Sequence, residues 1–123
     1  MDVTVNTNAY SGYQVYISDT GNGVNGGLFH SGGNLILSAD MVLSPGVAGY
    51  GAQASSPSAI VDPKYNYSGN TVGAVNISDN QLFSNLLAAT NEAATVIFKA
   101  AMSPTTTAGD YSDIIYFTVT PNL

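Results

Sequence analysis

The sequence predicts an all-β fold, and three observations support this. Apolar residues alternate with polar ones along several segments, which is the period of a half-buried β-strand. These segments are rich in valine, isoleucine, tyrosine and phenylalanine, which favour strands. Clusters of glycine, proline, serine and asparagine separate them, as in tight turns. About eight short strands with frequent turns are typical of a β-sandwich or a β-barrel.

Four segments carry the clearest strand pattern, and four shorter segments are further candidates. In one of the clear segments, Tyr13, Val15 and Ile17 alternate with polar or amphipathic neighbours. The four clear strands are expected at residues 3–7, 13–18, 94–101 and 114–120, and the shorter ones at 35–37, 49–54, 59–61 and 71–76. Turn clusters lie between them at 21–23, 26–27, 31–33, 44–46 and 55–57.

One segment has the spacing of a helix rather than of a strand. Leu82, Phe83, Leu86 and Leu87 fall on one stripe at i, i+4 spacing, and two alanines follow. Asp79 or Asn80 is placed to cap its start. The sequence therefore predicts at most one short helix, a crossover between sheets near residues 82–89.

Length and charge exclude several classes of protein. A chain of 123 residues with 45% hydrophobic content predicts a single globular domain over residues 1–123. Its net charge is −6, and Lys64 and Lys99 are its only basic residues, so we expect no binding to nucleic acid or anionic lipid. No apolar run is long enough to insert in a membrane. With no cysteine, disulfides, thiolate metal sites and a cysteine nucleophile are excluded.

The polar residues indicate where the protein works. Glycine, serine, threonine and asparagine dominate the polar positions, and only 8% of the residues are charged, which is typical of exported proteins. No signal peptide precedes the first strand. We therefore expect an extracellular or cell-surface location, and a module of a larger exported protein.

No arrangement of residues predicts an enzyme or a cofactor. A catalytic triad would have to use His30, the only histidine, and no nucleophile elbow accompanies it. A glycosidase needs two carboxyl groups that act together, whereas the acids here are scattered among turns. We interpret His30 as a surface-loop residue and the acids as turn and cap residues.

A weak candidate for a metal site begins at Asp19. Asp19, Asn22 and Asn25 resemble the oxygen-rich start of a calcium loop, but its twelfth position holds His30 instead of glutamate. The simpler interpretation is a hairpin turn, in which asparagine and glycine adopt positive φ angles. We therefore expect the protein to be indifferent to metal ions.

Tyr65 and Tyr67 are weak candidates for a ligand site. Two residues apart, they would lie on one face of a strand, where exposed rings stack on sugars. Ordinary packing of amphipathic rings in a sheet is the alternative interpretation.

Tyr111 is a candidate structural residue. It follows an Ala-Gly-Asp step shortly before the last strand, which suggests a tyrosine corner, the device that pins Greek-key connections. We expect its ring to be largely buried and its hydroxyl to bond to the backbone of the preceding loop. A tyrosine that simply packs on a strand is the alternative.

Two covalent modifications are also conceivable. An isopeptide bond would require a buried lysine beside an asparagine and an acid, and only Lys99 lies in the middle of a strand. A lysine that protects an edge strand from aggregation is the stronger interpretation. Asn66 and Asn76 begin Asn-x-Ser sequons, which matter only in a host that glycosylates them.

Strand and turn chemistry recurs in six segments, at 3–13, 17–23, 49–51, 103–106, 108–113 and 116–122. Together these segments resemble exported immunoglobulin-like β-sandwich modules of prokaryotic cell-surface proteins, similar to the WxL-like surface domains. With no tryptophan, the Trp-x-Leu wall-anchoring motif is absent. The resemblance implies an extracellular sandwich with a structural or adhesive role. It also implies a further strand before residues 4–9, which either lies upstream in the parent protein or is supplied by a neighbouring subunit.

We therefore expect a Greek-key immunoglobulin-like sandwich that is not an enzyme. The alternatives are a carbohydrate-binding module that uses exposed tyrosines and a filament subunit that assembles by donor-strand addition. We also expect copies to contact one another through an edge strand beside residues 3–7, with a surface glycan or protein as a further partner.

Overall fold

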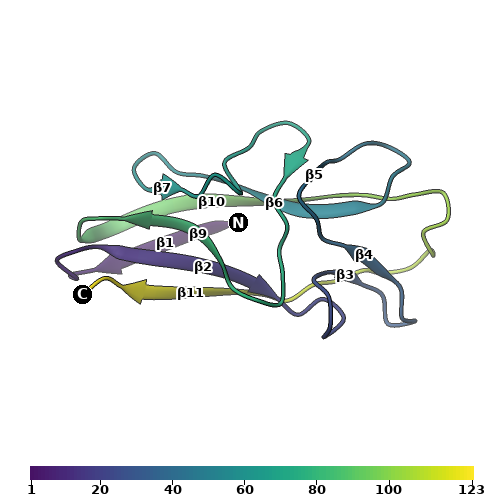
Figure 1. Ribbon diagram of the computed structural model, residues 1–123, viewed down its shortest axis with the longest axis horizontal. Helices are drawn as coiled ribbons and strands as arrows, with labels where there is room; N and C mark the ends of the chain where they lie inside the picture. Colours follow the sequence, from purple (N-terminus) through teal and green to yellow (C-terminus); the bar gives the residue numbers. More distant parts are fainter.

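The computed structural model describes all residues 1–123 and is all-β, with eleven strands and no helix. Two antiparallel sheets contain most of the strands (Figure 1). One sheet has the order β1 (Asp2–Thr7), β10 (Ala89–Ala101), β6 (Gly49–Ser55). The other has the order β11 (Ile115–Pro121), β2 (Tyr13–Asp19), β9 (Asn80–Asn85), β7 (Ile60–Val61). Two short pairs join β3 (Gly27–Phe29) to β4 (Leu35–Leu37) and β5 (Met41–Val42) to β8 (Thr71–Val72).

The two larger sheets share one apolar core. Alternate residues of β2, Tyr13, Val15 and Ile17, are fully buried in it, as the period-2 pattern predicts. From the other sheet, Ala94 and Val96 of β10 face them. Residues that water does not reach therefore line the inner faces of β1, β2, β6, β9 and β10, whereas β7 and β11 pack only partly buried residues against the core.

The expected helix at 82–89 is wrong. Residues 80–85 form β9, which pairs with β2, and the next strand begins at Ala89. The pairing skips Leu82, since Val15 lies opposite Phe83 and Tyr16 opposite Gln81. This β-bulge turns two successive side chains inward, so Leu82 and Phe83 are both fully buried. The bulge breaks the alternation of a strand, which is why the apolar spacing resembles that of a helix.

The remaining expected strands are present: the one at 35–37 has the expected bounds, and the others begin or end at different residues. The strand expected at 94–101 is longer and begins at Ala89, whereas the one expected at 71–76 covers only Thr71–Val72. The short strands β3 and β5 carry too few residues for a periodic pattern and escape prediction. The structure contains no helix of the length and apolarity that crossing a membrane requires.

The strand β10 is longer than either of its neighbours, and they cover different halves of it. The pairing with β1 runs from Ala89 to Thr95, and the pairing with β6 runs from Thr95 to Ala101. Met1 adds one more pair, since it exchanges backbone hydrogen bonds with Val96. Figure 1 shows the N-terminus lying partway along β10. Beyond Val96, β10 continues with β6 on one side and no strand on the other.

Candidate functional site

The second half of β10 presents an open backbone edge. In an antiparallel strand the N–H and C=O groups of successive residues point to opposite sides. Val96 bonds to Met1 on the β1 side, so the backbone groups of Phe98 and Ala100 point to that side too. No strand pairs with them there, because β6 lies on the other side. Two N–H groups and two C=O groups are therefore free to bond to an added strand.

An apolar groove of about 440 Å³ lies beside this edge. Met1 closes one end of it, so the groove continues the line of β1. Its walls come from both sheets and from the segment before β11. The apolar and aromatic residues that line it are Met1, Leu28, Tyr50, Phe98, Ala100, Tyr111 and Ile115.

The groove exists because the core is incomplete at this end. Phe98 and Ile115 pack against the core cluster from opposite sheets, yet both are only half-buried. Phe98 stacks on the buried ring of Tyr50, with the ring centroids 6.3 Å apart. A strand added in line with β1 would cover these inward-facing side chains as β1 covers the core beside the first half of β10.

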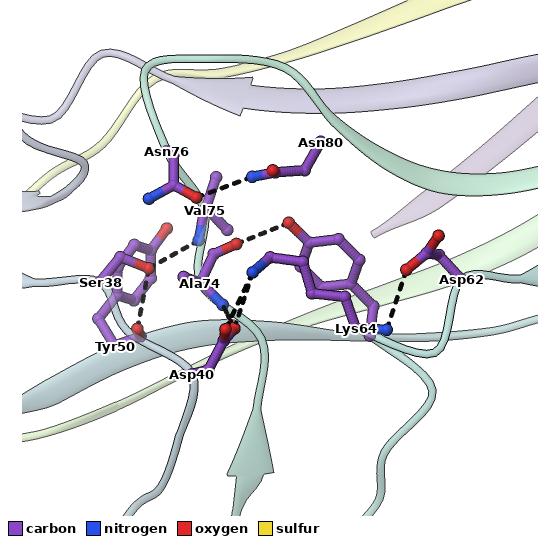
Figure 2. A network of polar contacts seen from close by, with 10 residues as sticks. Ser38, Asp40, Tyr50, Asp62, Lys64, Ala74, Val75, Asn76 and Asn80 are labelled. Carbon is purple, nitrogen blue, oxygen red and sulfur yellow. Dashed lines mark hydrogen bonds and ion pairs between the residues drawn. The ribbon is translucent and has the colours of Figure 1, made fainter.

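The outer edge of β6 is, in contrast, closed by the chain itself. Ala52 exchanges backbone hydrogen bonds with Gly73, and the N–H of Ala54 donates to the carbonyl of Tyr65. Figure 2 shows the polar contacts that hold this covering segment in place. The Ser38 hydroxyl bridges the Tyr50 carbonyl and the N–H of Val75.

The same network contains the one ion pair in the structure. The ammonium of Lys64 lies 2.9 Å from Oδ1 of Asp40, which also accepts the N–H of Ala74 (Figure 2). Although partial burial of Asp40 opposes ionisation, the bonds from Ala74 and Lys64 prevail and lower the pKa of Asp40. The segment over β6 is thus fixed by charge as well as by backbone pairing.

A pair of carboxyl groups lies at the groove, where Asp113 is part of the lining and Asp19 is buried beside it. Asp19 is 3% exposed; its Oδ2 accepts the N–H of Gly27 at 2.9 Å, and its Oδ1 has no hydrogen-bond partner. Burial, together with the adjacent Asp113 carboxyl, raises the pKa of Asp19 to about 7. Asp113 accepts hydrogen bonds from the hydroxyl of Tyr50 and from the N–H of Gly21. Burial of the Tyr50 hydroxyl, next to the charge of this carboxyl, raises the pKa of Tyr50. These bonds leave the groove floor with few free polar groups.

One side-chain oxygen each of Asp19 and Asn22, two of the metal candidates, accepts backbone N–H groups of the turn that follows Asp19. Oδ1 of Asn22 accepts the N–H groups of Val24 and Asn25, and Oδ2 of Asp19 accepts that of Gly27. No group of three or more histidine, aspartate or glutamate side chains gathers anywhere in the chain. The geometry is that of a capped turn.

The expectation that Tyr65 and Tyr67 share an exposed face is wrong. Tyr65 is fully buried, and its hydroxyl donates to the carbonyl of Ala74 at 2.6 Å, whereas Tyr67 is 45% exposed. Tyr65 lies in the segment that covers β6 rather than in a strand, so the side chains do not alternate as they would in a sheet. The ring of Tyr65 therefore has no face on which a sugar can stack.

Tyr111 makes the expected hydrogen bond but is less buried than expected. Its hydroxyl donates to the carbonyl of Thr107 at 2.6 Å, and its ring centroid lies 5.3 Å from that of His30. The ring is half-buried because it lines the open groove rather than the core between the sheets. His30 itself accepts the N–H of Gly32, in the loop where we placed it.

The structure places no isopeptide partner beside Lys99, and it leaves one of the two sequon asparagines exposed. The ammonium of Lys99 donates to the carbonyl of Gly69, and no asparagine or acid bonds to it, so the geometry of an isopeptide bond is not present. Of the sequon residues, Asn66 is exposed and Asn76 is half-buried, with its Oδ1 bonded to Asn80.

The residues of the groove escape prediction from the sequence. Met1, Leu28 and Ala100 carry no chemistry that marks a site, and only the folded chain brings them together. One signal is present: the alternation that begins near residue 94 runs for longer than the pattern at 3–7 that pairs beside it. A long strand beside a short one leaves an edge open.

Comparison of the chain with models of known protein families finds no match. Searches of the curated proteins and of the solved structures likewise find none.

Proposed function

We propose that this protein is a non-enzymatic structural or adhesive module of an extracellular surface protein, with a Greek-key immunoglobulin-like sandwich fold, and that it joins a neighbouring chain by strand addition. The observation that carries the proposal is the open edge at Phe98 and Ala100 beside an apolar groove. In β-augmentation, backbone hydrogen bonds supply affinity and pockets for alternate side chains supply specificity. This edge offers both.

The way the chain treats its other edges supports this function. Free strand edges invite pairing, and proteins usually cover them or interrupt them. Here the outer edge of β6 is covered by residues 65–76, whereas the outer sides of the edge strands β1 and β11 are unpaired, apart from the N–H that Pro121 removes from β11. The edge at Phe98 and Ala100 differs from those of β1 and β11 because an apolar groove lies beside it.

Composition supports the extracellular setting. Few charges and many small polar residues are typical of exported proteins, and the absence of cysteine does not exclude export. A structural or adhesive role in such a setting depends on contacts between chains, which an acceptor edge provides.

A chain extended by one strand tests the proposal. The segment Thr-Val-Glu-Val-Thr placed directly before Met1 would continue β1 along the open edge, at the high effective concentration of a tether. We expect the melting temperature to rise by about 3 °C or more relative to a Gly-Ser extension of equal length. If the melting temperature does not rise, and the amides of Phe98 and Ala100 are already protected from hydrogen exchange in the parent chain, the open edge is refuted.

Two proline variants locate the effect. Ala100→Pro removes an N–H that faces the groove, so the extended chain should lose its gain in melting temperature. Val119→Pro is the matched control. The backbone groups of Ile114 and Asn122 bond toward β2, so those of the even-numbered residues between them point the same way. The N–H of Val119, an odd-numbered residue, therefore points to the unpaired side of β11. The control should retain the gain. Loss of the gain in Val119→Pro alone would move the acceptor edge to β11.

A further inference from the structure

The geometry of the open edge also specifies the strand that fits it, an inference that rests on the proposed function. Met1 and Val96 form a hydrogen-bonded pair, so the next such pairs along β10 fall at Phe98 and Ala100. A strand in line with β1 runs antiparallel to β10. In a five-residue segment, the fourth residue lies opposite Phe98 and the second opposite Ala100.

Alternation assigns the faces of that segment. The side chains of Val96 and Phe98 point inward, so the second and fourth residues of the added strand point into the groove. Leu28, Tyr111 and Ile115 would surround them. These two residues should be apolar.

The third residue of the added strand lies opposite Lys99 on the outer face. The carbonyl of Gly69 holds the ammonium of Lys99 over β6, where Gln53 bonds to the same carbonyl, and no acid in the chain pairs with it. An acid on the added strand would offer this ammonium a charged partner in place of a neutral one. Opposite charges across a strand pair stabilise it, and like charges destabilise it. An acidic third residue is therefore favoured.

Lys99 also disfavours a second copy as the occupant. If two copies paired their open edges about a two-fold axis, with Phe98 of each opposite Ala100 of the other, Lys99 would face Lys99. Two like charges directly opposite one another weaken such a pair, and lysines on edge strands commonly prevent self-pairing.

We propose that the groove beside Phe98 and Ala100 binds an extended segment of a partner protein, antiparallel to β10, with apolar residues at its second and fourth positions and an acidic residue between them.

Free peptides titrated into the isotopically labelled protein test this directly. We expect acetylated and amidated Thr-Val-Glu-Val-Thr to shift the amide signals of Phe98 and Ala100 and to slow their hydrogen exchange at least tenfold. N-methylation of its fourth residue removes a bond to Phe98 and should abolish binding. N-methylation of its third residue, whose N–H points away from β10, is the matched control and should leave binding unchanged.

Charge reversal tests the acidic position. Replacing the central glutamate of the peptide by lysine should weaken binding about twofold to fivefold, the range of a cross-strand pair. The protein variant Lys99→Glu should reverse this preference. Serine at the second and fourth peptide positions should abolish binding.

The outcomes separate this inference from the proposed function. If the extended chain gains stability and the free peptides bind regardless of pattern, the inference is wrong and the proposed function stands. If no peptide binds at millimolar concentration although the extended chain gains stability, the groove takes a strand of its own chain, and both the inference and the proposed function are wrong. A concentration-dependent dimer that Ala100→Pro abolishes would make a second copy the occupant and overturn the inference. Peptide shifts confined to β11 would refute both.

Discussion

At the residue scale, Asp19 departs furthest from ordinary carboxyl chemistry. Burial and the neighbouring Asp113 raise its pKa from 3.8 to about 7. The folded chain therefore holds a proton that the unfolded chain releases, over the interval between those two values. Across this interval the free energy of unfolding falls as pH rises, and above about pH 7 this loss is complete.

Asparagine at this position should remove the loss. In Asp19→Asn a neutral amide replaces the carboxyl, with an oxygen for the N–H of Gly27 and a donor for Asp113. We expect the variant to exceed the parent in unfolding free energy by a few kcal/mol at pH 8 and to approach it near pH 4.5, as measured by urea denaturation. Asp79→Asn, at an exposed position, is the control. A parent and variant with parallel pH profiles would contradict the assigned pKa.

Two tyrosine hydroxyls allow a comparison of how much a buried and a half-buried hydrogen bond contribute to the free energy of unfolding. Tyr65 and Tyr111 each donate to a backbone carbonyl at 2.6 Å, but Tyr65 is fully buried and Tyr111 is half-buried. When the buried hydroxyl of Tyr65 is removed, the carbonyl of Ala74 loses its hydrogen-bond partner, and water cannot reach the carbonyl to take its place. The two losses should therefore differ in size.

Phenylalanine substitutions measure this difference. We expect Tyr65→Phe to lower the free energy of unfolding by roughly 1–3 kcal/mol and Tyr111→Phe by roughly 0.5–1 kcal/mol. Tyr67→Phe, which removes an exposed hydroxyl, should change little. Chemical denaturation of the three variants gives the order, and equal losses for Tyr65 and Tyr111 would show that burial of the bond is not what matters.

At the element scale, the bulge in β9 decides which leucines matter. A helix at 82–89 would bury Leu82 and Leu86 together, since they lie four residues apart. In the structure Leu82 is fully buried, whereas Leu86 is 69% exposed in the connection to β10. The two arrangements therefore predict different costs for the same substitution.

Alanine substitutions distinguish them. We expect Leu82→Ala to cost about 2–5 kcal/mol of unfolding free energy through the cavity that it leaves. Leu86→Ala should stay within about 0.5 kcal/mol of the parent. The measurement is denaturant unfolding monitored by tyrosine fluorescence. Comparable losses at both positions would favour a helix.

At the scale of the whole molecule, the negative charge is dispersed rather than gathered. The net charge is −6, yet one oxygen each of Asp19 and Asn22 accepts backbone N–H groups, and no cluster of three acids forms. A ligand that binds only the folded chain raises the free energy of unfolding by RT ln(1 + [L]/Kd), so a calcium site would make the melting temperature climb with calcium concentration. Millimolar calcium should therefore leave the melting temperature unchanged.

A thermal melt in calcium and in chelator checks this expectation. The two curves should coincide once ionic strength is matched with a monovalent salt, because a general screening effect acts on all the acids alike. A melting temperature that climbs steadily with calcium and falls again with chelator would establish a site, and Asp19→Asn would show whether it includes that carboxyl.

By itself, the sequence determined that the chain is all-β and where most of its longer strands lie. Alternation along 13–18 and 114–120 is a local property, set by which side chains prefer a half-buried strand, so it can be read without the fold. The hydrogen bond of Tyr111 to its own preceding loop spans only four residues and was predictable for the same reason. Local chemistry needs no distant partner.

Only the tertiary structure decided the rest, because it depends on pairing between distant segments. The bulge at Leu82 follows from the register with β2, and the burial of Tyr65 follows from the segment that covers β6. The candidate site arises from an offset: β1 pairs with one half of β10 and β6 with the other, which leaves Phe98 and Ala100 open. Register and strand length are properties of the pairs, since a single strand carries no information about where its neighbour stops.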